Sequence, residues 1–447
     1  MFTTGTLLRS LAVVGTLLSG VVDLAARADN PIIQTLFTAD PAPLVWNNTV
    51  YLFADHDESG ATTYNMKDWR LYTSTDMVNW RDHGVVMSLQ TFSWARADAW
   101  AGQVIARNNK FYFYASMSRQ GGGYAIGVGV SDTITGPYKD AIGRPLLSNS
   151  KIDPTVFIDD DDQAYMYWGN PGLDYVRLNK DMISYSGGIN AVQISNSNFQ
   201  GMAEGPWLYK RNGTYIQLYA ASCCPENIRY VTGPSATGPW TYRGIVMDTQ
   251  GASFTNHPAV INYKGGDYFF YHNGALPGGS GYQRSIAIEK FEYGPNNAIP
   301  NMRMTTQGAP QIGSLDPYVR VEAETIAFSS GLMTATSNDG GIHVAGISPN
   351  DYIKVKGVDF GAAGPASVNL RVAGGGNGAK VELRLGSTSG TVIATCNIDS
   401  TGGTGTWKTV TCPITGAATG KQDLFFKFVG NASPLFTFNW WQFTPKA

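Results

Sequence analysis

Charge is scarce in this 447-residue sequence, and neither sign prevails. Charged residues make up 15% of the chain, and 32 Lys and Arg residues stand against 34 Asp and Glu residues, for a formal net charge of -2. A chain without a basic field does not hold nucleic acid or an anionic membrane surface. We therefore expect neither partner, and a neutral ligand fits this balance.

Long runs of helix formers are missing, as are several familiar catalytic motifs. The chain has no Gly-Lys-Ser/Thr phosphate loop, no His-Glu-x-x-His zinc helix and no Gly-x-Ser-x-Gly elbow. It has 52 Gly, 23 Tyr and 11 Trp residues with many short turn signals, which is typical of β structure. The length and the 43% hydrophobic content allow two globular domains, and we expect both to be all-β.

Only four cysteines are present, and they lack the Cys-x-x-Cys spacing of a metal site. Cys396 and Cys412 are placed to join neighbouring strands. Cys223 and Cys224 are adjacent, which predicts either a bond between neighbours or two buried free thiols.

The apolar run Leu11–Val22 is too short to cross a bilayer. Arg9 precedes it and the small-x-small sequence Ala26-Arg27-Ala28 follows it, so we interpret residues 1–28 as a secretory signal. The mature protein is then expected to be secreted, soluble and monomeric. Export would expose three glycosylation sequons, at Asn47, Asn212 and Asn431.

A pattern of two strands joined by a tight turn recurs five times. Each unit has a short apolar strand, a turn of Asn, Asp or Gly, and a second strand rich in Tyr and Phe, which is hairpin chemistry. The Pro or Gly positions that open the units are 61, 52, 52 and 52 residues apart. Repeats of this length predict a five-bladed β-propeller over residues 29–314. The units open at Asp40-Pro41, Ala101-Gly102, Asp153-Pro154, Gly205-Pro206 and His257-Pro258.

In a propeller the innermost strands line a central channel, so residues at their starts converge. A single Asp-Pro pair would be read as a strand cap. Asp40, Asp153, Glu204 and His257 stand at equivalent repeat positions, which indicates a site instead. Converging carboxylates must separate their pKa values. Two carboxyl groups facing each other across a sugar suffice for glycoside hydrolysis, with no catalytic cofactor.

Aromatic residues near the predicted channel ends offer faces on which a sugar could stack. Each of them alone is more typical of a propeller core. The candidates for substrate contact are Trp100, Trp168, Asn170 in "MYWGN", and Phe254.

The segments "TADPAPL", "KIDPTVF" and "MAEGPWL" resemble glycoside hydrolase family 43 over residues 30–312. The resemblance implies an inverting mechanism. Asp40 would be the general base, Glu204 the general acid, and Asp153 the residue that orients the acid and raises its pKa. A general acid needs a proton near neutral pH, and a nearby carboxylate supplies such a shift.

The stretch "NHPAVINYKGGDYFFYHNGALPGGSGYQRSIAIEKF" is similar to the arabinoxylan arabinofuranohydrolases of that family. This similarity implies release of arabinofuranosyl side chains from arabinoxylan, with Arg284 beside the sugar pocket. His257 would line the axis or bind a cation, although a hydrogen-bonded core histidine is an equal alternative. β-Xylosidase or arabinanase activity would use the same three carboxylates, and a non-catalytic carbohydrate-binding protein is the alternative from another class.

After a linker rich in Pro, Gly and Asn, strands of period two such as "AKVELRLGS" and "QDLFFKFVG" predict a β-sandwich, of jelly-roll type, over residues 318–447. "VRVEAETIA" and "FTFNWWQF" resemble a family 6 carbohydrate-binding module. The resemblance implies a structural calcium ion on Glu322, Glu324 and Asn439, with surface carboxylates that hold no metal as the alternative.

This second domain departs from its family at the usual sugar cleft. Ile342, Thr404 and Thr437 stand where the family has an aromatic residue, a Trp and an Asn. Losing two stacking faces and an amide removes the main sources of sugar affinity. We therefore expect little sugar binding through that cleft.

Overall fold

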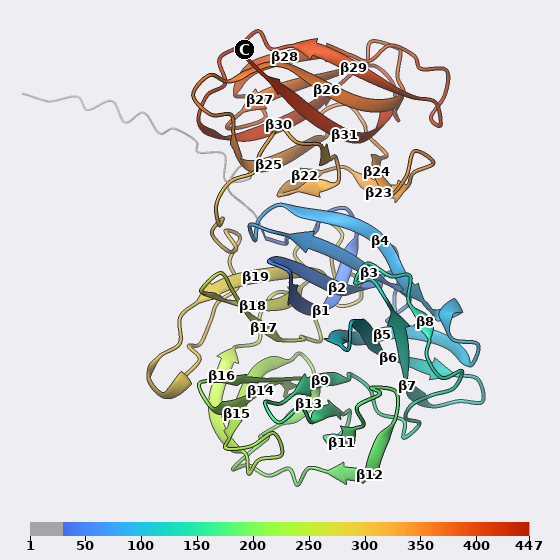
Figure 1. The fold of residues 1–447 in the computed structure, drawn as a ribbon, viewed down its shortest axis with the longest axis vertical. Helices are drawn as coiled ribbons and strands as arrows, with labels where there is room; N and C mark the ends of the chain where they lie inside the picture. Colours follow the sequence, from blue (N-terminus) through green and yellow to red (C-terminus); the bar gives the residue numbers. More distant parts are fainter. Residues whose placement is uncertain (1–29, 447) are drawn as a thin grey trace, which may run out of the picture.

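The described part of the chain, residues 30–446 of a computed structural model, is built almost entirely of β-strands (Figure 1). Its strands form seven sheets in which every strand pairing is antiparallel. The helical segments among these residues are two short 3-10 turns, η2 (Leu89–Thr91) and η3 (Pro295–Asn297). The all-β prediction is confirmed.

Five sheets follow one another in chain order. The first has β1 (Phe37–Trp46), β2 (Thr49–Asp57), β3 (Met66–Ser74) and β4 (Trp80–Ser88). The second has β5 (Ala95–Arg107), β6 (Lys110–Arg119), β7 (Tyr124–Ser131) and β8 (Lys139–Asp140). The third has β9 (Thr155–Ile158), β10 (Ala164–Trp168), β11 (Asp174–Leu178) and β12 (Tyr185–Ala191).

The fourth sheet has β13 (Met202–Arg211), β14 (Thr214–Ala221), β15 (Asn227–Gly233) and β16 (Thr241–Met247). The fifth has three strands, β17 (Ala259–Tyr263), β18 (Gly266–Asn273) and β19 (Ser285–Phe291). The first described residues complete its outer side, because the Ile32 N–H donates to the Ile286 carbonyl at 2.9 Å and Asn30 Nδ2 donates to the Ile288 carbonyl at 3.0 Å.

The first strands of these five sheets contact one another in sequence. β1 contacts β5, β5 contacts β9, β9 contacts β13, β13 contacts β17, and β17 contacts β1. This series of contacts closes on itself, so residues at corresponding ends of the five strands face a common space.

Four of the five sheets begin with a hairpin whose two turn residues both have positive φ. The turns are Asn47-Asn48, Asn108-Asn109, Asn212-Gly213 and Lys264-Gly265. Positive φ at both positions matches the right-handed twist of the flanking strands, and Asn and Gly tolerate it best. The hairpin prediction is therefore confirmed at these turns.

Two further sheets make the C-terminal part, and they share one core. One contains β20 (Val321–Glu322), β23 (Met333–Thr336), β24 (Ile342–Ala345), β26 (Pro365–Gly374), β29 (Trp407–Pro413) and β31 (Phe436–Pro445). The other contains β22 (Phe328–Ser330), β25 (Tyr352–Asp359), β27 (Lys380–Leu385), β28 (Thr391–Asn397) and β30 (Lys421–Val429). A disulfide between Cys396 of β28 and Cys412 of β29 joins the two sheets.

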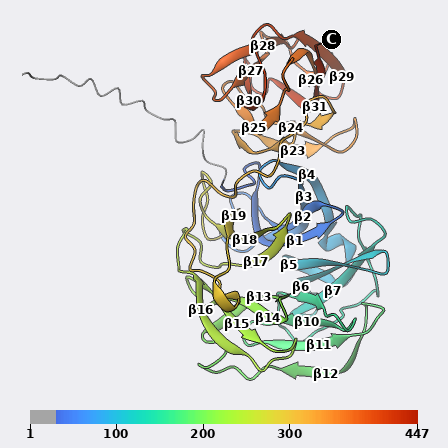
Figure 2. The same ribbon diagram turned by 60° about the vertical axis from the view of Figure 1, so that its left-hand side comes forward.

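The C-terminal sheets pack on the first of the five sheets, as the two ribbon views show (Figures 1 and 2). The short strand β21 (Thr325–Ile326) pairs with β4, and Thr334 Oγ1 donates to Asp82 Oδ2 at 2.6 Å. Ile342 is buried against Gly84 of β4, where an added β-carbon would lie 2.7 Å from Ile342 Cδ1. One position of the expected sugar cleft is thus covered by the first sheet.

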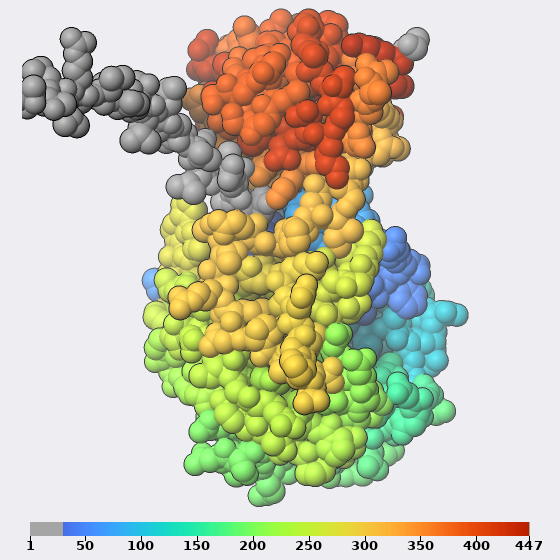
Figure 3. Space-filling view, turned by 90° about the vertical axis from the view of Figure 1, so that its left-hand side faces the viewer, coloured from blue at the N-terminus to red at the C-terminus, as the bar shows by residue number. Residues whose placement is uncertain are grey.

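The predicted linker lies on the protein surface and is tied to it by backbone hydrogen bonds. The Met302 N–H donates to the Val246 carbonyl at 2.7 Å, and the Ile312 N–H donates to the Asp76 carbonyl at 2.9 Å. In Figure 3 yellow to orange atoms of this part of the chain lie on the face toward the viewer, below the C-terminal sheets. The segment therefore packs along the molecule.

Two sequence predictions concern the ends and the cysteines. The interpreted secretory signal lies outside the described residues. Among residues 30–446, no helix is long and apolar enough to cross a membrane. Cys223 and Cys224 are bonded to each other and are exposed, so the alternative of two buried thiols is wrong.

Candidate active site

One pocket brings the three predicted carboxylates together. Asp40 comes from β1, Asp153 stands two residues before β9, and Glu204 lies in β13. Four other predicted residues line the same pocket: Trp100, Asn170, His257 and Arg284. Four residues that the sequence did not suggest complete it: Tyr64, Met66, Ile152 and Thr255.

Strand pairing is irregular beside Asp40 and Glu204, the two carboxylates that lie within strands. The β1–β2 register shifts between Ala39 and Ala42, and the β13–β14 register shifts on both sides of Glu204. Prolines follow at 41, 154 and 206, and a proline cannot donate to a strand ladder. Asp40 and Asp153 also adopt positive φ, 48° and 65°, a strained backbone typical of functional positions. Bulges of this kind re-aim side chains beside active sites.

The pocket has a volume of about 140 Å³. Sites that hold drug-sized ligands have volumes of roughly 300–1,000 Å³. A pocket this small suits one sugar unit and not a run of several units.

Asp40 lies beside the Arg284 guanidinium and two histidine rings. Arg284 Nη1 lies 3.3 Å from Asp40 Oδ1, and the Asp40 backbone N–H donates to His272 Nδ1 at 3.2 Å. Burial raises the pKa of Asp40, but Arg284, His272 and His257 outweigh it and hold that pKa well below its usual value. Asp40 is therefore ionised at neutral pH and can accept a proton.

Arg284 is itself fixed by a second carboxylate. Its Nη2 lies 2.9 Å from Asp57 Oδ1 and its Nε lies 3.0 Å from Asp57 Oδ2, a bidentate pair with high geometric specificity. Arg284 is 2% exposed. Asp57 thus holds the guanidinium in a fixed position beside the pocket, and its Nη1 is the atom that contacts Asp40.

Glu204 is a carboxyl group placed to release a proton near neutral pH. Burial and the negative charge of Asp40 raise its pKa to about 7. Asn170 Nδ2 donates to Glu204 Oε2 at 2.6 Å, and this hydrogen bond lowers the same pKa because it stabilises the charged form. Acid–base catalysis requires one group that donates a proton near pH 7 and one that is already ionised, so the pKa values of the two groups must differ. Glu204 and Asp40 meet this requirement.

Asp153 is a buried carboxyl group that interacts with Glu204 and with the backbone beside it. Burial first, and then the charges of Glu204 and Asp40, raise the pKa of Asp153 well above its usual value. Burial and the charge of Asp40 are the influences that raise the pKa of Glu204 most, while the mutual repulsion of Asp153 and Glu204 shows in the raised pKa of Asp153. The role of Asp153 in raising the pKa of the acid stays a prediction. Asp153 Oδ2 accepts the Gly205 N–H at 3.0 Å, which holds the backbone next to Glu204.

Two histidines flank Asp40, and the sequence suggested only one. His257 Nδ1 lies 3.7 Å from Asp40 Oδ1, and burial lowers the pKa of His257 to about 4, so its ring is neutral at pH 7. His272 Nε2 donates to the Thr255 carbonyl at 2.9 Å, which leaves Nδ1 free to accept the Asp40 N–H. An ion at His257 stays a prediction.

The aromatic candidates separate into three places. Trp100 lines the pocket, stacks on Tyr124 at 4.9 Å between ring centroids, and donates from Nε1 to the Tyr64 carbonyl. Trp168 is 0% exposed in the core beneath the third sheet, so its expected contact with substrate is wrong. Phe254 is 45% exposed and lies outside the pocket lining.

The expected calcium ligands lie at the start and end of the C-terminal sheets. The Ala323 N–H donates to the Asn439 carbonyl at 2.8 Å, which places Glu322 and Glu324 on either side of the residue that pairs with Asn439. Glu324 Oε2 and Asn439 Oδ1 are buried and have no hydrogen-bond partner among the described residues. Arg81 of β4 lies 3.8 Å from Glu322 and 3.7 Å from Glu324.

Comparisons with known proteins agree over both parts of the chain. Residues 28–299 match the family described as glycosyl hydrolases family 43, and residues 322–445 match carbohydrate binding module (family 6). An arabinoxylan arabinofuranohydrolase of Bacillus subtilis (strain 168) is 35% identical, covering 93% of this chain and 92% of its own. An arabinoxylan arabinofuranohydrolase of Paenibacillus polymyxa is 31% identical, covering 93% of this chain and 74% of its own.

A solved structure is similar over nearly the full length. It is a family 43 arabinoxylan arabinofuranohydrolase from Bacillus subtilis in complex with cellotetraose, with a TM-score of 0.83 and 33% identity. The likeness covers 94% of this chain and 98% of that one. The chain therefore belongs to glycosyl hydrolase family 43, is a glycosidase of the arabinofuranosidase group, and carries a family 6 carbohydrate-binding module.

Proposed function

We propose that this protein is a secreted, inverting α-L-arabinofuranosidase that removes arabinofuranosyl side chains from arabinoxylan. The observation that carries the proposal is the small pocket in which Asp40 is held ionised while Glu204 has a pKa near 7. Two relatives that each match 93% of this chain are arabinoxylan arabinofuranohydrolases, which supports this substrate. A pocket for one sugar unit supports removal of single side-chain residues.

β-Xylosidase activity is the second candidate. A xylosidase/arabinosidase of Bacteroides ovatus is 29% identical to this chain and covers 59% of it. The same two carboxyl groups would serve either sugar, because neither group depends on which pentose occupies the pocket. The full-length likeness to the arabinoxylan-acting relatives favours the first candidate.

For the architecture, we propose that the five sheets are the blades of a propeller and that the C-terminal sheets form a sandwich. The closed series of contacts among the five first strands supports the former. The core shared by the two C-terminal sheets supports the latter.

In the proposed mechanism, Asp40 accepts a proton from a water molecule as that water attacks the anomeric carbon. Glu204 gives its proton to the glycosidic oxygen, so the leaving chain departs neutral. Arg284 keeps Asp40 ionised before the reaction. Asp153 holds the Gly205 N–H and thereby the strand that carries Glu204.

Export, glycosylation and a monomeric state also belong to this proposal. Two disulfides fit an oxidising compartment. Asn47, Asn212 and Asn431 are all exposed, as attachment of a glycan requires.

We also propose a structural calcium ion held by Glu322, Glu324 and Asn439. The two buried oxygens without partners, on Glu324 and Asn439, support it, and an all-oxygen donor set is what calcium prefers. Such an ion would tie the two ends of the C-terminal sheets together. No catalytic step passes through it.

Carboxyl-to-amide variants test the two catalytic assignments. We expect Asp40→Asn and Glu204→Gln each to lower kcat on arabinoxylan by roughly 10²- to 10⁴-fold, because each removes one proton transfer. Glu292→Gln changes an exposed carboxylate and serves as the matched control with full activity. Wild-type rates in either pocket variant, with the fold verified by circular dichroism, would refute the assignment.

The pH profile tests the electrostatics of Glu204. The acid is active while protonated, so kcat/KM should fall as pH rises through about 7. Asn170→Ala removes a hydrogen bond that stabilises the charged form, so the alkaline limb should move to higher pH. Asn190→Ala, an exposed position on β12, should leave the limb in place. An alkaline limb that moves to lower pH in Asn170→Ala would contradict this account.

Product analysis tests substrate and stereochemistry together. Wheat arabinoxylan, arabinan and xylo-oligosaccharides are digested in parallel and followed by proton NMR. We expect arabinose from arabinoxylan, appearing first as the inverted anomer, since inversion places a water between the two carboxyl groups. Retained anomer would overturn the mechanism, and xylose as the main product would favour the second candidate.

Chelation tests the calcium proposal. An ion that binds only the folded state stabilises it by mass action, so EGTA should lower the Tm of the C-terminal transition by roughly 5–10 °C. Calcium in excess should restore the transition, and Glu324→Gln should abolish the response. An unchanged calorimetric scan in EGTA would show that Arg81 alone balances these carboxylates.

A further inference from the structure

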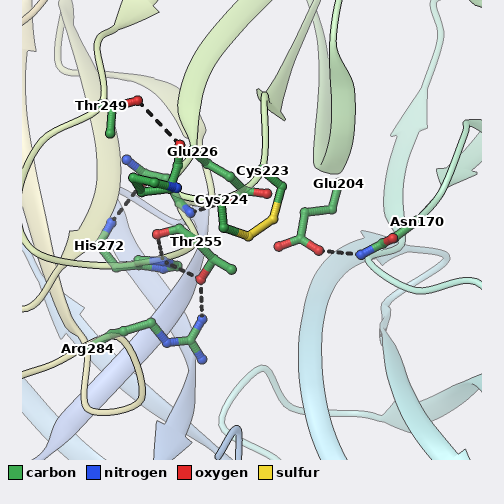
Figure 4. The surroundings of a disulfide bond; sticks show 11 residues. Asn170, Glu204, Cys223, Cys224, Glu226, Thr249, Thr255, His272 and Arg284 are labelled. Carbon is green, nitrogen blue, oxygen red and sulfur yellow. Dashed lines mark hydrogen bonds between the residues drawn. A yellow bond between two sulfur atoms is a disulfide. The ribbon is translucent and has the colours of Figure 1, made fainter.

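The bond between Cys223 and Cys224 lies in an exposed loop beside the active site. Residues 222–225 follow directly on β14, and all four are exposed. Figure 4 shows the disulfide drawn between Glu226 and Glu204. This loop has no part in the mechanism described above.

Stabilisation of the fold does not explain this bond. A disulfide stabilises mainly by closing a loop in the unfolded chain, and the effect grows with loop length. Adjacent cysteines close almost no loop, and they join no separate elements. The contrast is with Cys396 and Cys412, which are buried, lie 16 residues apart and connect two sheets.

The strand register places the loop at the same sheet end as the general acid. Ala220 of β14 pairs with Glu204 of β13, and Cys223 follows three residues later. Both cysteine sulfurs lie within 4.8 Å of a carboxylate oxygen of Glu226. Glu226 is 3% exposed, and after burial the charge of Glu204 is the largest influence that raises its pKa. The disulfide is therefore a neighbour of the acid.

Two hydrogen bonds of Glu226, one from its side chain and one from its backbone, hold the end of this loop in position. Glu226 Oε2 accepts the Asn256 N–H at 2.8 Å, and the Glu226 N–H donates to the Phe254 carbonyl at 3.0 Å. The exposed Phe254 thus lies on the chain segment bonded to the end of the loop.

The position of the disulfide relative to Glu204 indicates which part of the substrate it would contact. Neither cysteine lines the sugar pocket. If Glu204 is the general acid, as proposed above, it faces the glycosidic oxygen, and the surface beyond it receives the leaving group. In arabinoxylan the leaving group is the xylose chain.

A disulfide of adjacent cysteines suits contact with a sugar ring. Its sulfurs and methylene groups are apolar and polarisable, and the small covalent ring that includes the joining peptide bond is already ordered. Binding against a rigid surface loses little conformational entropy. Ser222 and Pro225 add no charge to this surface.

We propose that the Cys223–Cys224 disulfide is the platform of a leaving-group subsite and packs against the apolar face of a xylose unit of the polysaccharide backbone. This inference rests on the proposed function, because it assigns Glu204 as the acid and arabinoxylan as the substrate.

Inhibition by the two halves of the substrate tests the subsite. The double variant Cys223→Ala/Cys224→Ala is compared with wild type, using arabinoxylo-oligosaccharide hydrolysis with xylotetraose or L-arabinose as inhibitor. We expect the inhibition constant of xylotetraose to rise about tenfold, or about 1.4 kcal/mol, and that of arabinose to rise far less. Cys396→Ala/Cys412→Ala is the matched control and should keep the wild-type ratio of the two constants.

Reduction provides a second measurement in case the double variant folds poorly. Treating the folded Cys396→Ala/Cys412→Ala chain with a phosphine reductant opens only the Cys223–Cys224 bond and should raise the xylotetraose constant in the same way. An unchanged constant, or an equal rise for arabinose and xylotetraose, would overturn the subsite. The same assay first shows whether the wild-type enzyme releases arabinose. If it releases none from arabinoxylan, the proposed function is refuted, and this outcome is distinct from a failure of the subsite.

Discussion

The pairing of Arg284 with Asp57 and Asp40 is the interaction on which the site depends. Several buried carboxyl groups share one small pocket, and they cannot all ionise at equal cost. Because Asp57 fixes the guanidinium, its charge acts on Asp40 and not evenly on all of them. The pKa of Asp40 falls while those of Asp153 and Glu204 rise. One fixed cation thus divides similar carboxyl groups into a base and an acid.

The strand irregularities serve the same end. In regular strands, successive side chains point to opposite faces of the sheet. A carboxylate in such a strand would point to one face of its own sheet. Pro41 in β1 and Pro206 in β13 interrupt the ladders of those strands. The left-handed backbone at Asp40 and Asp153 turns their side chains toward the shared pocket. The cost of strained backbone is offset by hydrogen bonds such as that from the Gly205 N–H to Asp153.

Much of this arrangement is readable from sequence because the fold repeats. Spacing of about fifty residues identified Asp40, Asp153 and Glu204 together, and Asn-Asn turns predicted hairpins. Arg284 and Asp57 are 227 residues apart. They meet only because the fifth sheet packs against the first, and no local sequence pattern predicts this pair. The prediction for Trp168 is wrong because every residue of its strand, β10, is buried. A strand that is buried on both faces shows no alternation of apolar and polar residues, so the sequence does not indicate which side chains face a pocket. His272 lies within an aromatic strand and gave no separate signal.

The C-terminal module uses one position of the expected sugar cleft for packing between the two domains. The family resemblance predicts Ile342 at a cleft position, and in the structure this residue is buried against Gly84 of the first sheet. Gly84 has φ +76°, which favours glycine, and its missing side chain leaves the space that Ile342 fills. The side chain at position 342 therefore contacts β4 and is not open to a sugar. Residue 342 cannot both pack against the first sheet and line an open cleft. In this protein it packs against the first sheet.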